Sequence, residues 1–100
     1  MDRLQNVHPG EVLLEDYLRP LGMTQYRLAQ SLGVRQIAIS EIVRGKRSIT
    51  PTMALLLGRF FECSPRFWLN LQNAYDLEEE EGQMADRLNN IIPIGLPEAA

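Results

Sequence analysis

Residues that start and stop α-helices recur along the whole of this 100-residue chain, and they constrain its fold more than any other feature. Pro9, Pro51 and Pro65 each follow a polar residue, as prolines at the first position of a helix do, where the missing N–H costs nothing. Thr24 is a good N-cap, and Gly33 suits the left-handed conformation in which many helices end. Strand-like alternation never extends beyond a few residues. The sequence therefore predicts an all-α fold.

These signals divide the chain into five short helices. The expected ranges are 9 to about 20, ended by Pro20 and Gly22, then 25–32, about 35–44, about 51–61, and from 65 into the glutamates at 78–81. Beyond residue 82 we expect at most a short helix around residues 84–90, because Pro93 and Pro97 favour an extended or frayed end.

The composition excludes several classes of protein. No apolar run approaches the ~20 residues that span a bilayer, and the N-terminus lacks the apolar core of a secretion signal, so we expect a cytoplasmic protein with no membrane partner. The single cysteine, Cys63, excludes an internal disulfide and a multi-cysteine metal site. His8 is the only histidine, and no glycine-rich phosphate loop is present. We expect no enzyme, no metal, no cofactor and no small-molecule substrate.

Charge is strongly segregated along the chain, although the net charge is only −3. Residues 24–47 contain five basic residues and one acidic residue, whereas residues 76–100 contain seven acidic residues and one basic residue. The two segments therefore carry local charges of +4 and −6. Such segregation indicates two different surfaces, and the basic one can meet a polyanion despite the acidic total.

The basic segment has the spacing of two helices that cross around a tight turn. The small Ala29 allows a close crossing, and Gly33 permits a turn that most residues resist. Ile39, Ile42 and Val43 form an apolar stripe at i, i+3 and i+4. This pattern predicts a helix-turn-helix whose second helix faces outward. On the apolar pattern alone, an ordinary helical hairpin explains the spacing equally well.

The polar residues of the second helix favour the helix-turn-helix. They lie on or beside the face opposite the apolar stripe, at Arg35, Gln36, Ser40, Glu41 and Arg44. Arginine and glutamine form bidentate contacts with guanine and adenine edges in the major groove. Lys46 and Arg47 follow at once, where contacts to backbone phosphates would fix the register.

Ile37 lies about 200° from Ile39 around a helix of ~3.6 residues per turn. If Ile39 is buried, Ile37 is exposed, and Ala38 projects near it. Apolar side chains at this place could contact thymine methyl groups. The alternative is an isolated surface isoleucine, which is common in soluble proteins.

The aromatic residues gather in the last third of the chain. We expect Phe60, Phe67 and Trp68 to form the core behind the helix-turn-helix, while Leu71 and Tyr75 could equally belong to that core or to an interface. Glu78–Glu81 point in four directions around a helix, so they form a solvated helix end rather than a metal site. If they bind anything, it is a basic partner.

The segments TQYRLAQSLGV and ISEIVRGKRSIT resemble the helix-turn-helix of phage-repressor-like (Xre/Cro-type) proteins. A closer resemblance, to HigA/VapI-type antitoxins, covers about residues 8–77. It rests on HPGEVLLEDYLRPLGMTQYRLAQSLGV, GKRSITPTMALLLGRFF and SPRFWLNLQNAYDL, of which HPGE and SPRFWLNLQ are the most specific parts.

The resemblance implies a five-helix lambda-repressor-like DNA-binding domain at residues 1–82, followed at 83–100 by a tail or an arm for a dimer or another partner. It implies a homodimer that binds an operator palindrome, represses its own operon and neutralises a RelE-like (HigB-type) ribonuclease toxin of a type II toxin-antitoxin system. The family's DNA-contacting positions fall at Gln25 and from Arg35 to Arg44, and its phosphate-contacting loop falls at Lys46 and Arg47.

One position departs from the family pattern, in which the second helix starts with Ser, Thr or Pro and then a basic residue. Here Val34 and Arg35 cannot cap the helix with their side chains, so the exact start and the choice between Arg35 and Gln36 as a base contact stay open. Two other functions also stay open: a freestanding helix-turn-helix transcriptional regulator without a toxin, and an interaction module that no longer binds DNA.

Overall fold

The computed structural model describes residues 6–95, all of whose regular elements are helical. They are α1 (Pro9–Val12), the π-helical segment η1 (Leu13–Leu18), α2 (Arg19–Leu21), α3 (Gln25–Leu32), α4 (Gln36–Val43), α5 (Pro51–Phe61), α6 (Pro65–Gln83) and α7 (Ala85–Asn89). The all-α class is confirmed. Because α1, η1 and α2 follow one another without a break, the chain forms the five expected helices and a sixth, α7, at the place where a short helix was expected. Pro97 lies outside the described residues.

The first helix runs through Pro20 and ends at Gly22, so of the two residues that we expected to end it, only Gly22 does so. The C-cap is Gly22, in the left-handed conformation with φ 61°. In the preceding turns the Arg19 N–H donates to the Leu14 carbonyl, five residues back. This wider π-helical turn leaves room for a proline ring that clashes with the carbonyl four residues earlier in an α-helix.

Capping side chains set the starts of α3, α5 and α6. The hydroxyls of Thr24, Thr50 and Ser64 each accept a hydrogen bond from a backbone N–H in the following turn, at 3.0 to 3.2 Å. Arg35 is the N-cap residue of α4 and has no side-chain capping bond, as its residue type predicts. The start of α4 therefore depends on packing rather than on a cap.

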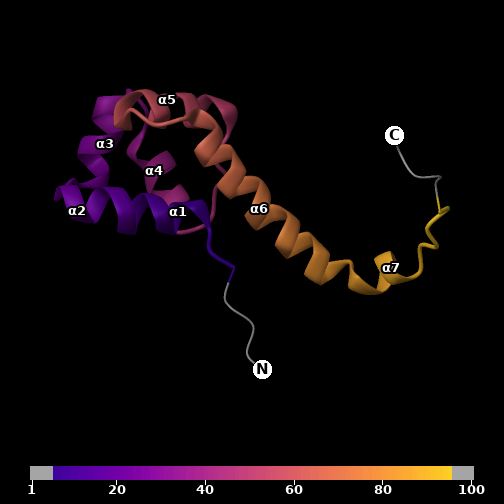
Figure 1. Cartoon of the computed structure of the whole chain (residues 1–100). Coiled ribbons are helices and arrows are strands. Elements are labelled where there is room, and N and C mark those ends of the chain that lie inside the picture. Colours follow the sequence, from indigo (N-terminus) through magenta and orange to yellow (C-terminus); the bar gives the residue numbers. More distant parts are fainter. Residues whose placement is uncertain (1–5, 96–100) are drawn as a thin grey trace.

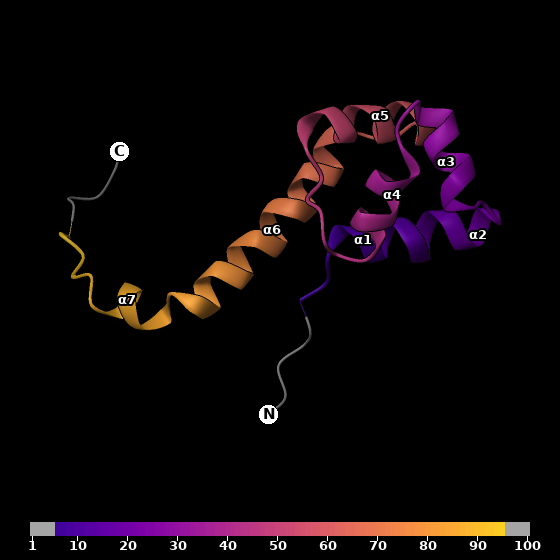
Figure 2. The same cartoon turned by 180° about the vertical axis from the view of Figure 1, so that it is seen from behind.

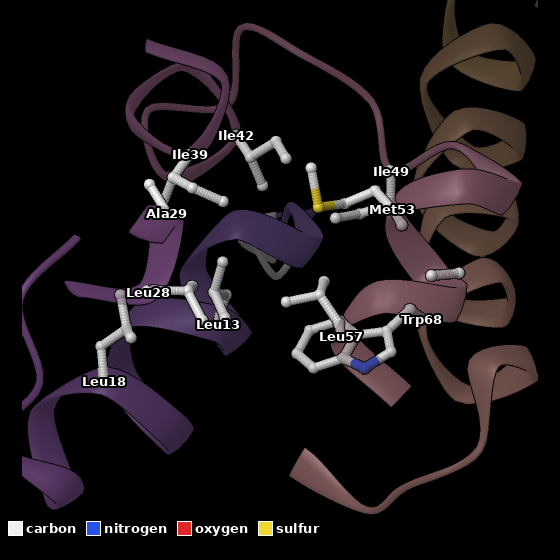
Figure 3. Close-up of a cluster of buried hydrophobic side chains, with 11 residues drawn as sticks. Leu13, Leu18, Leu28, Ala29, Ile39, Ile42, Ile49, Met53, Leu57 and Trp68 are labelled. Atoms are coloured by element: carbon white, nitrogen blue, oxygen red, sulfur yellow. The ribbon is translucent and has the colours of Figure 1, made fainter. Parts of the chain in front are cut away.

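The hydrophobic core lies where the first helix, α3, α4, α5 and the start of α6 meet (Figure 3). Leu13, Leu28, Ile39, Leu57 and Trp68 are fully buried there. The expectation of a core position is confirmed for Trp68. It is only partly met by Phe60, which is half-buried against the core. It is wrong for Phe67, which is 37% exposed because it lies about 100° around the helix from the buried Trp68, although the two rings still pack edge-on.

Only the first part of α6 contacts the other helices. The rest of this long helix runs away from the body and carries α7 and the C-terminal segment with it (Figures 1 and 2). The molecule is therefore elongated, with principal extents of 52 × 36 × 23 Å. The domain boundary expected at residue 82 falls one residue before the end of α6. None of the helices in the described part of the chain is long and apolar enough to cross a membrane.

Candidate nucleic-acid interface

The pair α3 and α4 has the geometry of a helix-turn-helix. Gly33 ends α3 with φ 71°, and the Val34 N–H donates to the Ala29 carbonyl at 3.0 Å, which closes the turn. A Cβ at Gly33 would meet no atom within 4 Å, so its backbone conformation, not lack of space, requires glycine. Ala29 is buried at the crossing of the two helices, as its small size predicts.

α4 buries one face and exposes the other. Ile39 and Ile42 are fully buried, whereas Ile37 is 46% exposed, which confirms the opposition expected from helical periodicity. Arg35 and Gln36 are exposed before and at the start of the helix. Ala38, Ser40 and Glu41 are half-buried along its flank. The surface that α4 offers is therefore mainly polar, with the exposed apolar side chain of Ile37 in it.

The segment after α4 is basic and turns back toward the helix. Arg44, Lys46 and Arg47 are exposed, and Gly45 makes the turn with φ 75°. The Arg47 guanidinium Nε donates to the Glu41 carboxylate at 2.9 Å, and the Lys46 N–H donates to the Glu41 carbonyl at 2.8 Å. Glu41 therefore neutralises Arg47 and fixes the loop. Within the described residues, Arg44 and Lys46 form no ion pair, so their charges remain available to a polyanion.

Gln25 is the first residue of α3 and is half-buried, next to the capping Thr24. A side chain at this position lies where the N–H groups of the first helical turn have no partner within the helix. Such a helix start favours an anion such as a DNA phosphate. The structure thus places the sequence-predicted residues on the start of α3, on α4 and on the loop that follows α4.

The start of the first helix supports α4 from behind, which the sequence pattern did not indicate. A Cβ at Gly10 would lie 1.8 Å from the Ile42 carbonyl oxygen, so α1 touches the backbone of α4 directly. The signal that could have revealed this contact is a glycine at the second position of a helix, where glycine is unfavourable unless close packing demands it.

His8 completes this support. Its Nδ1 accepts a hydrogen bond from the Gly10 N–H at 2.9 Å, and its ring meets that of Tyr75 edge-on at 4.8 Å. A Cβ at Gly45 would lie 3.6 Å from the same ring, so His8 also lies under the basic loop. The side chain is buried and caps α1. The first helix, α6 and the end of α4 therefore meet at one histidine.

Gln72 links α6 to the connection between α4 and α5. This buried side chain accepts a hydrogen bond from the Ile49 N–H at 2.7 Å and donates one to Asp76 at 2.9 Å. The bond satisfies a backbone N–H that the loop would otherwise bury without a partner. It also fixes the path of the chain that follows the basic loop.

Acidification should lower the stability of the fold through protonation of His8. Burial lowers the pKa of His8 below its ordinary value of 6.5, and the nearby carboxylates of Asp76 and Glu11 offset only part of that effect. The unfolded chain therefore takes up a proton on this histidine first as the pH falls. The contribution of His8 to stability is fully present above pH 6.5 and declines between 6.5 and the lower pKa of the folded state.

Melting temperatures of the wild type and of His8→Asn, measured from pH 8 to about 5, test this pH dependence. Asn keeps an N-cap oxygen but does not titrate. If the melting temperature of the wild type falls no more steeply with acidification than that of the variant, His8 is not the group responsible.

The described residues contain no cluster of three or more side chains that could hold a metal ion. The fold and the outward-facing α4, with Arg35 before it and the basic loop after it, define a helix-turn-helix protein, with the second helix free to enter a major groove.

Comparison with known proteins agrees with this class. The helix-turn-helix family model matches residues 14–68. The virulence-associated protein I of Dichelobacter nodosus is 47% identical over 88 residues, which cover 88% of this chain and 81% of the relative. The antitoxin HigA-1 of Vibrio cholerae is 31% identical over 88 residues, covering 88% and 83%. The structure of the Pseudomonas aeruginosa antitoxin HigA with the higBA promoter matches with a TM-score of 0.87 and 34% identity, covering 92% of this chain and 100% of that one.

The chain therefore belongs to the helix-turn-helix family, in the branch that includes virulence-associated protein I and the HigA antitoxins. This is a family of DNA-binding regulators and antitoxins, which is not an enzyme class.

Proposed function

We propose that the chain is a homodimeric cytoplasmic antitoxin that binds the operator of its own operon through α4 and neutralises a RelE-like (HigB-type) ribonuclease toxin. The observation that carries the proposal is the outward face of α4, whose polar side chains lead into a basic loop in which Arg44 and Lys46 form no ion pair within the described residues. The presence of a promoter in the structure of the similar Pseudomonas aeruginosa HigA supports the same assignment.

In this proposal α4 enters the major groove of an operator palindrome. Arg35 and Gln36 contact base edges, and Ser40 contributes a hydroxyl beside them. Ile37 and Ala38 meet thymine methyl groups, which accounts for an exposed isoleucine at the centre of a polar face.

Phosphate contacts come from the flanks of the same surface. Gln25 at the start of α3 binds one phosphate, and Arg44 and Lys46 bind others. Arg47 keeps N–H groups for a phosphate while Glu41 holds its guanidinium in place. In a dimer, two such surfaces reach half-sites about 34–36 Å apart.

Arg44→Ala and Lys46→Ala will each weaken operator binding about tenfold and reduce the slope of log affinity against log salt by about one. The reason is that each loses one phosphate contact together with its counterion release. Fluorescence anisotropy on the chain's own promoter, titrated with salt, measures both quantities. Arg19→Ala is the control, since Arg19 is an exposed arginine on the first helix that pairs with Glu15. Unchanged binding in both loop variants would remove α4 and its loop from the DNA interface.

The toxin part of the proposal has a separate test. A small basic protein encoded next to this gene should copurify with the chain and lose its RNA-cleaving activity in the complex. The absence of such a gene would instead favour the alternative, a freestanding helix-turn-helix transcriptional regulator with the same DNA interface. A promoter shift assay, run with and without the neighbouring gene product, distinguishes these two functions from a third. The antitoxin and the freestanding regulator both shift the promoter DNA, whereas an interaction module that does not bind DNA leaves it unshifted.

A further inference from the structure

A small polar hollow lies between the segment that precedes α1, the loop that follows α4 and the middle of α6. Its volume is about 200 Å³, and the residues around it include Asn6, His8, Glu11, Arg44, Gly45 and Tyr75. Arg44 and Gly45 belong to the basic loop of the proposed DNA interface, so the hollow opens beside that loop. Neither the sequence pattern nor the family resemblance assigns the segment before α1 to DNA binding.

The hydrogen bond that His8 makes determines which of its ring nitrogens carries the proton. Nδ1 accepts from the Gly10 N–H at 2.9 Å, so the hydrogen of the neutral ring is on Nε2. Within the described residues Nε2 forms no hydrogen bond, and no fully buried side-chain nitrogen or oxygen is left without a partner. The ring is buried, yet Nε2 is not sealed inside the protein, and its N–H faces the hollow.

The ring of His8 is held in place from the side of α6. It meets the Tyr75 ring edge-on at 4.8 Å. The side-chain amide of Asn6 donates to the Tyr75 carbonyl at 2.9 Å and to the Glu79 carboxylate at 3.1 Å, which fixes the segment before α1 against α6 (Figures 1 and 2). The Nε2–H is therefore a preorganised donor, which loses little freedom when it binds an acceptor.

The charges around the hollow define the acceptor. Arg44 and Glu11 both line it and form no ion pair with each other in the described part of the chain. The nearby carboxylates of Asp76 and Glu79 accept hydrogen bonds from side-chain amides. A guanidinium and a neutral N–H together suit an anionic oxygen such as that of a phosphate. The opposing Glu11 favours a phosphodiester with one negative charge over a free dianion.

We propose that this hollow binds one phosphodiester of the operator backbone, with the His8 Nε2–H and the Arg44 guanidinium donating to its non-bridging oxygens. His8 is then a DNA contact as well as the N-cap of α1. The backbone is the source of the phosphate, because the hollow is continuous with the loop that carries Lys46, another proposed phosphate contact. This inference rests on the proposed function, since it adds a contact to the proposed DNA interface.

The first test observes the wild-type protein by nuclear magnetic resonance. His8 is the only histidine, so a chain with isotope-labelled histidine and no histidine tag gives the signals of a single imidazole. At about pH 7.5 the operator duplex should shift the Nε2 signal and slow the exchange of its proton, while Nδ1 keeps the signal of an unprotonated nitrogen. Inorganic phosphate at the same phosphate concentration should leave these signals unchanged, because Glu11 opposes a dianion that no other contact holds.

The second test measures operator affinity by fluorescence anisotropy over a range of salt concentrations. His8→Asn keeps an oxygen that caps α1 but removes the Nε2–H, so it should weaken binding about tenfold. A neutral donor releases no counterion, so the slope of log affinity against log salt should stay that of the wild type, unlike the slope of Arg44→Ala.

Glu11→Gln tests the same site in the opposite direction. It removes the carboxylate that opposes the phosphate, so it should tighten operator binding about threefold. Asp16→Asn is the control, because it makes the same change of charge on an exposed side chain farther along the first helix. It should change the affinity clearly less than Glu11→Gln does.

Operators that carry a single neutral methylphosphonate separate a direct contact from a structural effect. At one backbone position in each half-site, the losses caused by His8→Asn and by Arg44→Ala should both fall to less than about twofold, because the charged oxygen that they share is already gone. A loss that reflects damage to the fold would persist at every position.

Four outcomes would overturn the inference. An imidazole that is unchanged in the operator complex, or a His8→Asn loss that no methylphosphonate removes, excludes His8 from the DNA contact and leaves the interface of α4 intact. An equal shift with inorganic phosphate assigns the hollow to a free anion. A wild type that does not bind the operator in anisotropy removes the proposed DNA interface and this contact together.

Discussion

Gly10→Ala will lower the free energy of unfolding by about 3 kcal/mol or more and abolish operator binding. The added Cβ would lie 1.8 Å from the Ile42 carbonyl oxygen, 2.7 Å from its carbon and 3.0 Å from the Val43 Cα. All three are backbone atoms, which cannot rotate away as the end of a side chain can. Either the start of α1 or the end of α4 must therefore move, and the end of α4 leads directly into Arg44.

Thermal unfolding followed by circular dichroism measures the first effect. For a domain of this size, about 3 kcal/mol corresponds to a fall in Tm of more than about 12 °C. Gly82→Ala is the control, because Gly82 lies exposed near the end of α6 and alanine there should be neutral or stabilise by about 0.5–1 kcal/mol. Anisotropy below the Tm of the variant tests operator binding. A Gly10→Ala protein that melts with the wild type would show that α1 and α4 do not touch as described.

The sequence predicted most accurately the features that depend on neighbours along the chain. The hydroxyl of Thr24 caps α3, and Gly33 ends it, because a cap and its partner N–H lie within one turn. The exposure of Ile37 and the burial of Ile39 follow from helical periodicity alone. The outward face of α4 was therefore predictable residue by residue.

Contacts between distant residues were not predictable in this way. The bond from the Ile49 N–H to Gln72 joins residues 23 apart in sequence, and the contact of Gly10 with Ile42 depends on how the first helix crosses α4. The pairing of Arg47 with Glu41 requires the loop to turn back at Gly45, which periodicity cannot reveal. The contacts that could not be predicted from the sequence are therefore those behind the candidate interface, and not the residues on its outward face.

The same support extends to α6 through Trp68. Its ring is fully buried beside Leu57 (Figure 3), lies 5.1 Å from the ring of Tyr17 in the first helix, and donates from Nε1 to the Cys63 Sγ at 3.3 Å. The Trp68 side chain therefore joins the first helix, α5 and α6. Loss of the indole would leave a large cavity where these three elements meet.

Trp68→Ala will therefore lower the free energy of unfolding by about 3–5 kcal/mol, measured by urea denaturation. Phe67→Ala is the matched control, because the adjacent ring is 37% exposed and its removal should cost clearly less. Equal losses of unfolding free energy in the two variants would contradict the burial of Trp68 between the first helix, α5 and α6.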